Sequence, residues 1–375
     1  MKLKLTAILG ALLLFGASAE PRLAVSDAAA NQIIILDAHD GTQLGSFTVP
    51  GATGGTLTVS GGGQHLIATH RDANRVSIIH SGLFVEDHGD HGHLHASAPH
   101  VLATVNTGPR PGHVTVAGQQ LLVFHDGDGS VALLDENLFG LSMNYRLSEG
   151  AGPDHGSAEL LDGYMMTGVG QSGVVAVRGL STGDSVASFE CPAAHGSISV
   201  AGQVLFGCQD AVLLLDAGLN ARYVSVPDGA RVGAFYAAAD GIAIGNSGSG
   251  LALIDSDTAE LHTVPLPATP RTAAFTDTGL VVLAADGSLH LLQLTDGQAH
   301  LVHSLSGVVG AEQPEGRPAL AAWHNDVWVS DPGSGQVKRF SSATGELQPV
   351  AVFETGGNPA GLGLLMPAGD FSEHH

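Results

Sequence analysis

Histidine is the residue type in this chain whose number and spacing could support chemistry. Twenty of the 375 residues are histidine, and five of these fall in the segment EDHGDHGHLHASAPH, residues 86–100. Short His-rich tracts are compositional indicators of metal binding. The Gly, Asp and Ser residues between them predict a mobile arm, with a solvated insertion that holds no metal as the alternative. We expect a secondary, mobile metal site made by His88, His91, His93, His95 and His100.

A second group of histidines recurs at regular positions. His155 and His195 each begin the tripeptide HGS at the start of an apolar segment, and His113 lies two residues further along in the preceding one. Side chains alternate along a strand, so these three should point to one side. Imidazole with an occasional carboxylate suits Zn²⁺, at about 2.0–2.2 Å per bond, although Cu²⁺ would bind more tightly. We expect a tighter metal site drawn from His113, His125, His155, His195, Asp126 and Asp128.

A sequence repeat places these histidines. Each unit holds a short apolar segment, a Gly turn, a second apolar segment, a turn rich in Asp, Asn and Gly, a third segment and a more polar fourth one. The glycine of the first turn recurs at spacings of 45, 39, 39 and 38 residues, at Gly118, Gly163, Gly202, Gly241 and Gly279. A period of this length with four short strands is typical of a β-propeller blade.

Seven units follow one another along the chain, and an eighth is expected from both of its ends. The segment RLAVSDAAANQIIILDA, from Arg22, would supply the later strands, and NPAGLGLLMP, from Asn358, the inner strand. Such shared closure removes the last open sheet edge of the ring. We predict an all-β, single-domain β-propeller over residues 20–375, with eight blades of four antiparallel strands and seven blades as the alternative.

Blade topology assigns the two groups of histidines to opposite faces. The start of an inner strand and the turn between the second and third strands lie on one face of the disc, which is where the HGS and VFHDGD motifs fall. The His-rich segment follows a third strand, so it should be anchored on the other face. Five further histidines show no such register and are expected at the surface: His65, His262, His290, His300 and His303.

The N-terminus indicates export. Residues 1–19 combine a basic start, an apolar core too short to span a bilayer, and a small-residue cleavage site, which together are typical of a signal peptide. In a bacterium this predicts a periplasmic protein without a membrane-spanning segment. Without Lys2 and Lys4 the chain has 12 basic and 36 acidic residues, a net charge of −24. Such a charge repels nucleic acid and attracts cations.

The two cysteines and the lack of a strong catalytic motif narrow the function. In an oxidising compartment Cys191 and Cys208 are expected to form a disulfide, with thiolate metal ligation as the alternative. The sequence contains no H-E-x-x-H motif. A metal-dependent propeller enzyme, such as a lactonase or lyase, and a non-catalytic interaction scaffold remain open. The enzyme predicts a polar ring drawn from all blades, whereas these histidines fall in one sector.

Several of these segments together resemble one known family. They are the signal peptide, the short-repeat propeller, the EDHGDHGHLH insertion and the blade starts GPRPGHV, GPDHGS and AAHGS. In these features the whole mature chain resembles the AztD zinc metallochaperones. The resemblance implies a periplasmic zinc carrier, not an enzyme, which hands Zn²⁺ to the zinc-specific solute-binding protein of an ABC importer. A member specialised for another metal, or one that only stores it, stays an alternative.

The sequence thus predicts a monomeric zinc metallochaperone with two histidine sites. Its acidic surface would raise the local concentration of cations. Zinc would leave by ligand exchange, in which histidines of the recipient replace those of the donor one at a time. An incompletely enclosed site favours this exchange, because an open coordination position admits the incoming ligand.

Overall fold

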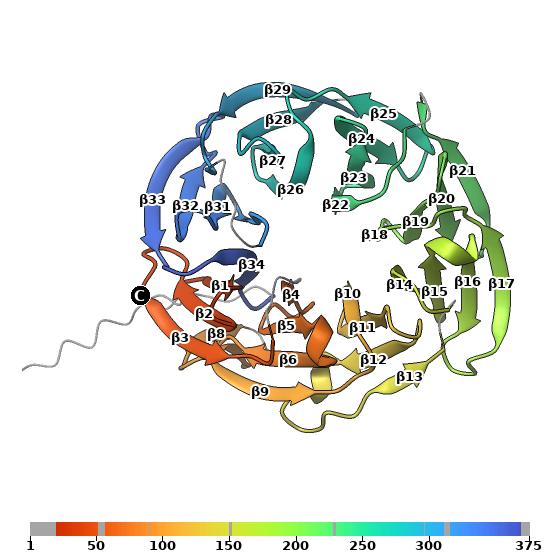
Figure 1. Ribbon diagram of the computed structural model, residues 1–375, viewed down its shortest axis with the longest axis horizontal. Coiled ribbons are helices and arrows are strands. Elements are labelled where there is room, and N and C mark those ends of the chain that lie inside the picture. Colours follow the sequence, from red (N-terminus) through yellow and green to blue (C-terminus); the bar gives the residue numbers. More distant parts are fainter. Residues whose placement is uncertain are drawn as a thin grey trace, which may run out of the picture.

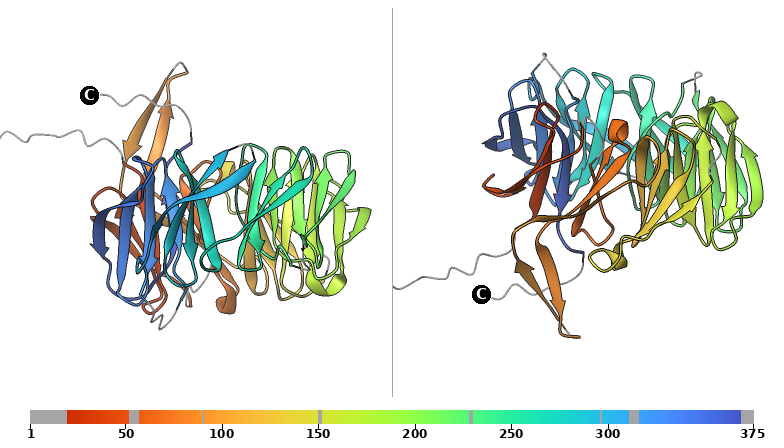
Figure 2. Two further views of the ribbon diagram at one scale, coloured as in Figure 1. Left: turned by 90° about the horizontal axis from the view of Figure 1, so that it is seen from above. Right: turned by 60° about the horizontal axis from the view of Figure 1, so that its bottom comes forward.

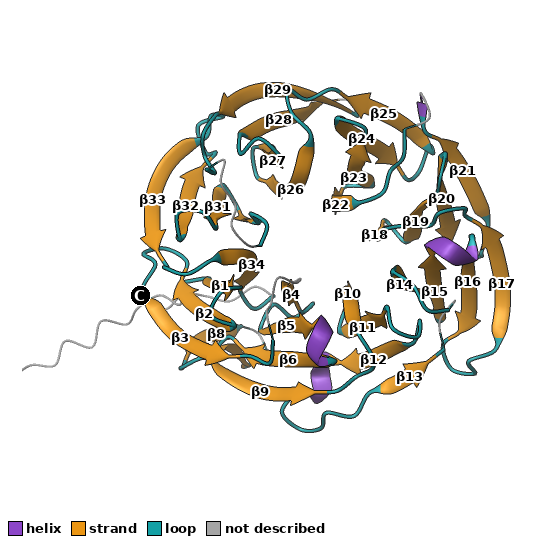
Figure 3. Cartoon of the chain, viewed as in Figure 1, coloured by secondary structure: helices purple, strands orange, loops and turns teal. Residues whose placement is uncertain are grey.

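The computed structural model describes residues 20–51, 57–89, 91–149, 152–227, 230–295, 297–310 and 316–368. Eight four-stranded antiparallel sheets stand around a central axis; the innermost strand is the first in chain order in seven of them and is β34 (Pro359–Leu365) in the eighth (Figure 1). Helices in the described residues are limited to short 3₁₀ turns, as the colouring by secondary structure shows (Figure 3). The expected all-β propeller of eight blades, with four antiparallel strands in each, is confirmed.

Each blade runs from an inner strand beside the channel to an outer strand at the periphery of the disc. Blade 1 has β34 (Pro359–Leu365), β1 (Arg22–Asp27), β2 (Gln32–Asp37) and β3 (Gln43–Thr48). Blade 2 has β4 (Leu57–Val59), β5 (His65–His70), β6 (Arg75–His80) and β9 (His100–Val105). Blade 3 has β10 (Pro111–Ala117), β11 (Gln120–His125), β12 (Val131–Asp135) and β13 (Arg146–Ser148). Blade 4 has β14 (Gly156–Leu161), β15 (Tyr164–Val169), β16 (Val174–Gly179) and β17 (Ser185–Glu190).

The second half of the ring repeats this order. Blade 5 has β18 (Ser197–Val200), β19 (Gln203–Gly207), β20 (Ala211–Asp216) and β21 (Ala221–Ser225). Blade 6 has β22 (Phe235–Ala239), β23 (Ile242–Ser247), β24 (Gly250–Asp255) and β25 (Glu260–Val264). Blade 7 has β26 (Pro270–Thr276), β27 (Gly279–Ala284), β28 (Leu289–Thr295) and β29 (Gln298–Leu305). Blade 8 has β30 (Leu320–Trp323), β31 (Asp326–Asp331), β32 (Gln336–Ser341) and β33 (Gln348–Glu354). Within the described residues, short 3₁₀ turns between strands include η1 (Arg71–Ala73), η2 (Glu136–Leu138) and η3 (Gly170–Ser172).

Closure of the ring occurs in blade 1. Strand β34 pairs antiparallel with β1, and Val25 lies opposite Leu362. The blade therefore takes its inner strand from one end of the described chain and its other three from the opposite end, as the sequence predicted. Among the described residues, no helix is long and apolar enough to cross a membrane.

The core lies between neighbouring blades. The second and third strands of a blade are apolar runs buried on both faces, as in β5 and β20, whereas outer strands such as β3 are largely exposed. Side chains of one blade pack against the next, so that Met166 of blade 4 and Phe206 of blade 5 share one cluster and are fully buried. This packing fixes the spacing between adjacent inner strands, and with it the spacing of side chains along the channel.

The His-rich segment forms a hairpin instead of an unstructured arm. Strand β7 (Leu83–Asp87) pairs antiparallel with β8 (Gly92–Ala96), inserted between β6 and β9. The hairpin projects from one face of the disc, and η1 and η3 lie on the other (Figure 2). The expected opposition of the two histidine groups is therefore seen. Arg22 of β1 donates hydrogen bonds to the carbonyl oxygens of Ser81 and Ser97, which flank the hairpin.

Candidate metal centre

Three histidines from consecutive blades meet in one row at the channel rim. We call His113, His155 and His195 the rim row. The ring centroids of His113 and His155 are 4.7 Å apart, and those of His155 and His195 are 5.1 Å apart. The Nε2 atoms of His113 and His155 are 3.0 Å apart. The repeat-aligned histidines of the sequence are thus brought together by blades 3, 4 and 5, as expected.

Local backbone geometry explains how the row forms. A bulge interrupts the pairing of β10 with β11 at Gly112 and His113, and a bulge can redirect a side chain. This redirection accounts for the contact of His113 with His155, although His113 lies two residues deeper in its repeat. Gly196 adopts a φ of +73°, a left-handed conformation that favours glycine. A Cβ on Gly156 would lie 2.5 Å from the carbonyl oxygen of Gly168, so glycine follows both HGS histidines for steric reasons.

Asp126 supports the middle of the row. Its Oδ2 lies 3.0 Å from Nδ1 of His155 and also accepts a hydrogen bond from Arg71. The side chain is 2% exposed, and its Oδ1 has no hydrogen-bond partner among the described residues. Burial alone would raise the pKa of this carboxyl, but the bonds from His155 and Arg71 outweigh burial and leave the pKa below its ordinary value. Asp126 is therefore a carboxylate at neutral pH.

The other two rings of the row are held uncharged. Nδ1 of His195 donates to the carbonyl oxygen of Gly233, which leaves Nε2 without a proton. Burial lowers the pKa of His195 despite that bond. Burial, reinforced by the nearby His155, lowers the pKa of His113 to about 4. Neutral imidazole is the form that binds metal, so His113 and His195 are in the binding form at neutral pH.

Two members of the predicted site take other roles. His125 is fully buried, and its Nε2 bonds to the Thr107 hydroxyl while Nδ1 bonds to Ser130. With both nitrogens engaged in the core, His125 has none left for a metal. Asp128 accepts the backbone N–H of Ser130 and shapes the turn after β11. The side chains of both residues hold the turn that places Asp126, and neither belongs to the row.

The hairpin gathers three of its histidines at its tip. The ring centroids of the three are 5.5 Å (His88 to His91), 5.0 Å (His88 to His93) and 4.8 Å (His91 to His93) apart. We call these three residues the tip triad. His95 instead stacks on Phe84 and bonds to Glu86, with Nε2 3.0 Å from Oε2. The fifth predicted ligand, His100, lies outside the hairpin, at the start of β9.

A third group was missed by sequence reasoning. His65, His80 and His100 pair directly across β5, β6 and β9, and we call them the base cluster, because they lie at the base of the hairpin. The sequence did hold a partial signal: His65 begins the strand before the η1 turn and His80 ends the strand after it. Burial, together with the neighbouring His65, His100 and Arg22, lowers the pKa of His80 to about 4.

Of the five histidines expected at the surface, two are buried. His65 is 8% exposed and His290 is 2% exposed, so the surface prediction is wrong for these two. His290 bonds to Ser288 and Ser304 within blade 7. His262 and His300 are exposed as expected, and His303 is half-buried. A histidine with both ring nitrogens bonded to core hydroxyls is a structural residue, and its type alone does not reveal this.

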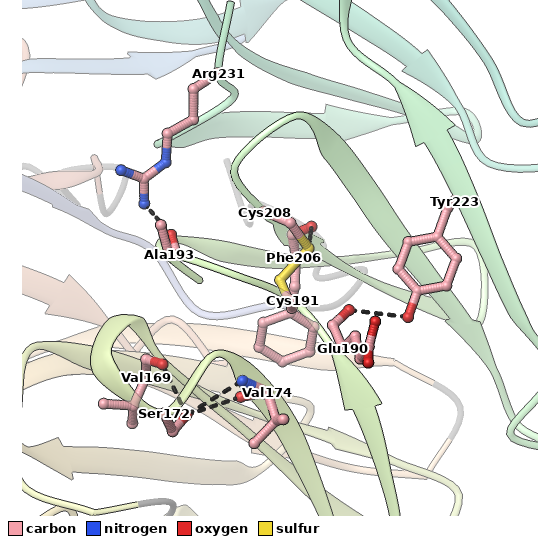
Figure 4. Close-up of a disulfide and its surroundings, with 10 residues drawn as sticks. All are labelled: Val169, Ser172, Val174, Glu190, Cys191, Ala193, Phe206, Cys208, Tyr223 and Arg231. Carbon is pink, nitrogen blue, oxygen red and sulfur yellow. Dashed lines mark hydrogen bonds between the residues drawn. A yellow bond between two sulfur atoms is a disulfide. The ribbon is translucent and has the colours of Figure 1, made fainter. Parts of the chain in front are cut away.

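The two cysteines form a disulfide between blades 4 and 5. Cys191 follows β17 and Cys208 follows β19, and both are buried around the bond (Figure 4). The disulfide expected from the sequence is therefore confirmed. Arg231 donates to the carbonyl oxygen of Ala193, and the backbone N–H of His195 donates to that of Gly207. The loop that carries His195 is thus held by the bridge and by both hydrogen bonds.

In the part of the chain that the structure describes, no three His, Cys, Asp or Glu side chains already stand in the arrangement of a complete metal site. Two ligands of a tetrahedral Zn²⁺, each about 2.0–2.1 Å from the metal, lie about 3.3 Å apart. The 3.0 Å between Nε2 of His113 and Nε2 of His155 is close to that separation. The side chains would have to rotate to bring further ligand atoms to the metal.

Together these features define an eight-bladed β-propeller with a row of histidines at the start of three consecutive inner strands. The chain is 26% identical over 414 residues to the zinc chaperone AztD of Citrobacter koseri, covering 96% of this chain and 94% of that protein. The resemblance predicted from the sequence is therefore confirmed. No known protein-family profile matches the chain.

Solved structures confirm the propeller fold. The crystal structure of Citrobacter koseri AztD superposes with a TM-score of 0.83 at 22% identity, covering 94% of this chain and 99% of that one. Dihydro-heme d1 dehydrogenase NirN superposes with a TM-score of 0.65 at 13% identity, covering 93% and 78%. At such identities these neighbours establish the architecture alone, so function has to be argued from the side chains.

Proposed function

We propose that this protein is a periplasmic zinc metallochaperone, a carrier and not an enzyme. In this proposal it delivers Zn²⁺ to the zinc-specific solute-binding protein of an ABC importer. The rim row is the tighter site, with His113, His155 and His195 as ligands. The observation that carries the proposal is the 3.0 Å approach of two Nε2 atoms, one of them on a ring bonded to a buried carboxylate. Similarity to a zinc chaperone along the chain supports it.

The hydrogen bonds of the row suggest how zinc is loaded. Asp126 accepts a hydrogen bond from Nδ1 of His155, and Nε2 of His155 and Nε2 of His113 share one proton between them. Zn²⁺ would take the place of this shared proton, which would pass to Nδ1 of His113 or to water, so that both Nε2 lone pairs face the metal. A carboxylate behind a ligating histidine fixes the ring and raises its basicity. Asp126 is placed for that role.

Release would depend on the exposure of the row. The side chain of His155 is 42% exposed, so an incoming histidine of the recipient can reach the metal from the channel mouth. The tip triad, on the opposite face, would collect zinc more weakly, because its rings stand on a hairpin that projects from the disc (Figure 2). The net charge of −24 for the chain without residues 1–19 would favour the approach of cations.

A competitive zinc titration of the mature chain tests this assignment. The variants are His155→Ala/His195→Ala for the rim row and His88→Ala/His91→Ala/His93→Ala for the tip triad. The control is His262→Ala/His300→Ala, which removes two exposed histidines from outer strands. We expect the rim-row variant to lose tight zinc binding. The tip-triad variant should lose only one equivalent of more weakly bound zinc, and the control should bind zinc as the wild type does.

Transfer is tested by mixing the zinc-loaded protein with a metal-free, zinc-specific solute-binding protein and following the metal. Loss of transfer in the rim variant, with transfer retained in the control, is the expected result. Tight binding that survives the rim substitutions but disappears with the tip substitutions would reverse the assignment of the two sites. A wild-type protein that binds no zinc tightly would end the proposal.

A further inference from the structure

Arginines recur at the starts of inner strands, on the face of the disc that carries the rim row. Inner strands all start on this face, because every blade repeats the same strand order. Four of the 12 basic residues outside residues 1–19 lie there: Arg110 before β10, Arg231 before β22, Arg271 in β26 and Arg317 before β30. The last three belong to blades 6, 7 and 8, and blade 7 lies across the channel from blade 3 (Figure 1). The channel mouth therefore has a histidine sector in blades 3 to 5 and an arginine sector in blades 6 to 8.

The backbone that carries Arg271 departs from regular strand pairing. The register of β26 with β27 shifts between Pro270 and Thr272, which makes Arg271 a bulge residue. A bulge re-aims a side chain, and the bulge of β10 does the same for His113. The hydroxyl of Tyr236, in β22 of blade 6, donates a hydrogen bond of 3.2 Å to the carbonyl oxygen of Pro270. The neighbouring blade thus holds the bulged backbone in place.

Arg271 and Arg317 act on each other instead of on a carboxylate. Among the described residues, neither guanidinium forms an ion pair with Asp or Glu. Burial, and then the nearby charge of Arg317, lowers the pKa of Arg271. Arg271 is half-buried and Arg317 is exposed, so both can be reached from solvent. Two like charges kept together in a chain with 36 acidic residues cost free energy, which an anion from outside the chain would offset.

We propose that Arg271 and Arg317 anchor a carboxylate-bearing surface of the protein that takes zinc from the rim row. This inference rests on the zinc carrier proposed above. A guanidinium group binds a carboxylate through paired hydrogen bonds, so two adjacent arginines fit neighbouring Asp or Glu side chains of the recipient. The net charge of −24 repels the same surface elsewhere. Attraction confined to the arginine sector therefore orients the recipient, with its metal ligands over the histidine sector.

Transfer kinetics test the anchor. The zinc-loaded mature protein is mixed with rising concentrations of a metal-free, zinc-specific solute-binding protein, and the rate of zinc transfer is followed. Arg271→Gln/Arg317→Gln should raise the recipient concentration that gives the half-maximal rate by about tenfold. The limiting rate and the zinc affinity of the rim row should not change. The control Arg75→Gln/Arg146→Gln, which removes two exposed arginines of β6 and β13, should transfer zinc as the wild type does.

A covalent crosslink identifies the group that the arginines contact. Lys338 is the only lysine in residues 20–375, and its Nζ is engaged in an ion pair. Arg271→Lys/Arg317→Lys keeps both charges and places two amines at the channel mouth, where a carbodiimide can couple them to carboxylates. Mass spectrometry should find these two lysines joined to Asp or Glu side chains of the recipient. The control Arg75→Lys/Arg146→Lys should give no such crosslinks.

The outcomes separate the anchor from the carrier. If the wild type transfers zinc and Arg271→Gln/Arg317→Gln shows the wild-type half-maximal concentration, the anchor is overturned and the carrier stands. The same holds if the control variant loses as much, or if the arginine substitutions lower the zinc affinity of the rim row instead. A wild type that binds no zinc tightly ends the carrier, and the anchor with it. If circular dichroism shows that the Gln variant is unfolded, the crosslinks of the Lys variant decide.

Discussion

The rim row and the base cluster each align three imidazoles beside one buried carboxylate, but different parts of the fold align them. In the rim row the histidines come from three blades, and the spacing of adjacent inner strands sets their separation. In the base cluster the histidines come from three strands of one blade, and the register of strand pairing sets their separation. A propeller thus has two independent directions along which it can gather ligands, around the ring and across a blade.

The two supporting carboxylates both come from blade 3, but they support histidines of different neighbouring blades. Asp126 belongs to blade 3 and supports His155 of blade 4, whereas Glu136 belongs to blade 3 and supports His65 of blade 2. For each, burial would raise the pKa, and the hydrogen bonds it accepts hold the pKa below its ordinary value. Blade 3 therefore contributes an ionised carboxylate to a histidine group on each face.

The largest expected effect comes from removing the middle of the rim row. His155 contacts both neighbouring rings and Asp126, so His155→Ala should weaken the tightest zinc site by more than the tenfold to hundredfold typical of a supporting residue. His100→Ala should leave that site unchanged. Zinc titrations of the two variants check this. Equal losses in both would mean that the two groups are one coupled site.

A smaller effect is expected at the supporting carboxylate. Asp126→Asn keeps an oxygen that can accept the Nδ1 proton of His155 but removes the charge. Zinc affinity of the rim row should fall by about tenfold to hundredfold. The matched change Asp128→Asn, two residues along and in the turn only, should have no such effect. An Asp126→Asn protein with wild-type affinity would remove Asp126 from the site.

A third effect concerns stability. It involves Glu159, a carboxyl group whose pKa is raised, whereas the pKa values of Asp126 and Glu136 are lowered. Glu159 of β14 is almost fully buried and accepts hydrogen bonds from Ser197 and Ser199 of blade 5, each at 2.8 Å. Burial raises its pKa to about 7, although the two serines act in the opposite direction. The folded protein then holds this proton over a range where the unfolded chain has lost it. Its contribution to stability is full below pH 4.5 and is lost as the pH rises towards 7.

The prediction is that Glu159→Gln removes this pH dependence. The wild-type free energy of unfolding should lose about 2 kcal/mol from this group between pH 5 and pH 7, and the variant should not. Chemical denaturation at both pH values measures the difference. Parallel pH profiles for the two proteins would show that the Glu159 carboxyl titrates as it does in the unfolded chain.

The smallest effect on stability is expected at the hairpin tip. His88→Ala/His91→Ala/His93→Ala should change the free energy of unfolding by no more than about 0.5 kcal/mol, because these residues project away from the blade cores. The same variant should lose one weak equivalent of zinc. Thermal unfolding with and without zinc separates the two readouts. A large loss of stability without metal would show that the triad is structural.

Sequence periodicity predicted the blade count, the shared blade and the alignment of His155 with His195, because these follow from a repeat that each blade must obey. It could not place His125 correctly, because the hydroxyl partners Thr107 and Ser130 come from a neighbouring loop and turn. It also missed the pairing of His80 with His100. That register spans the inserted hairpin and contains a bulge, so it is settled by tertiary packing.

The shared blade has a kinetic consequence. Arg22 pairs with Leu365, so the contact that closes the ring joins residues separated by about 340 positions. Contacts of such long range are slow to form, because the entropy of loop closure is lost before the contacts of the two strands stabilise the chain. Until β34 docks on β1, two apolar blade edges stay open to pairing with other chains. Closure should therefore be a late folding step, and the chain most prone to aggregation just before it.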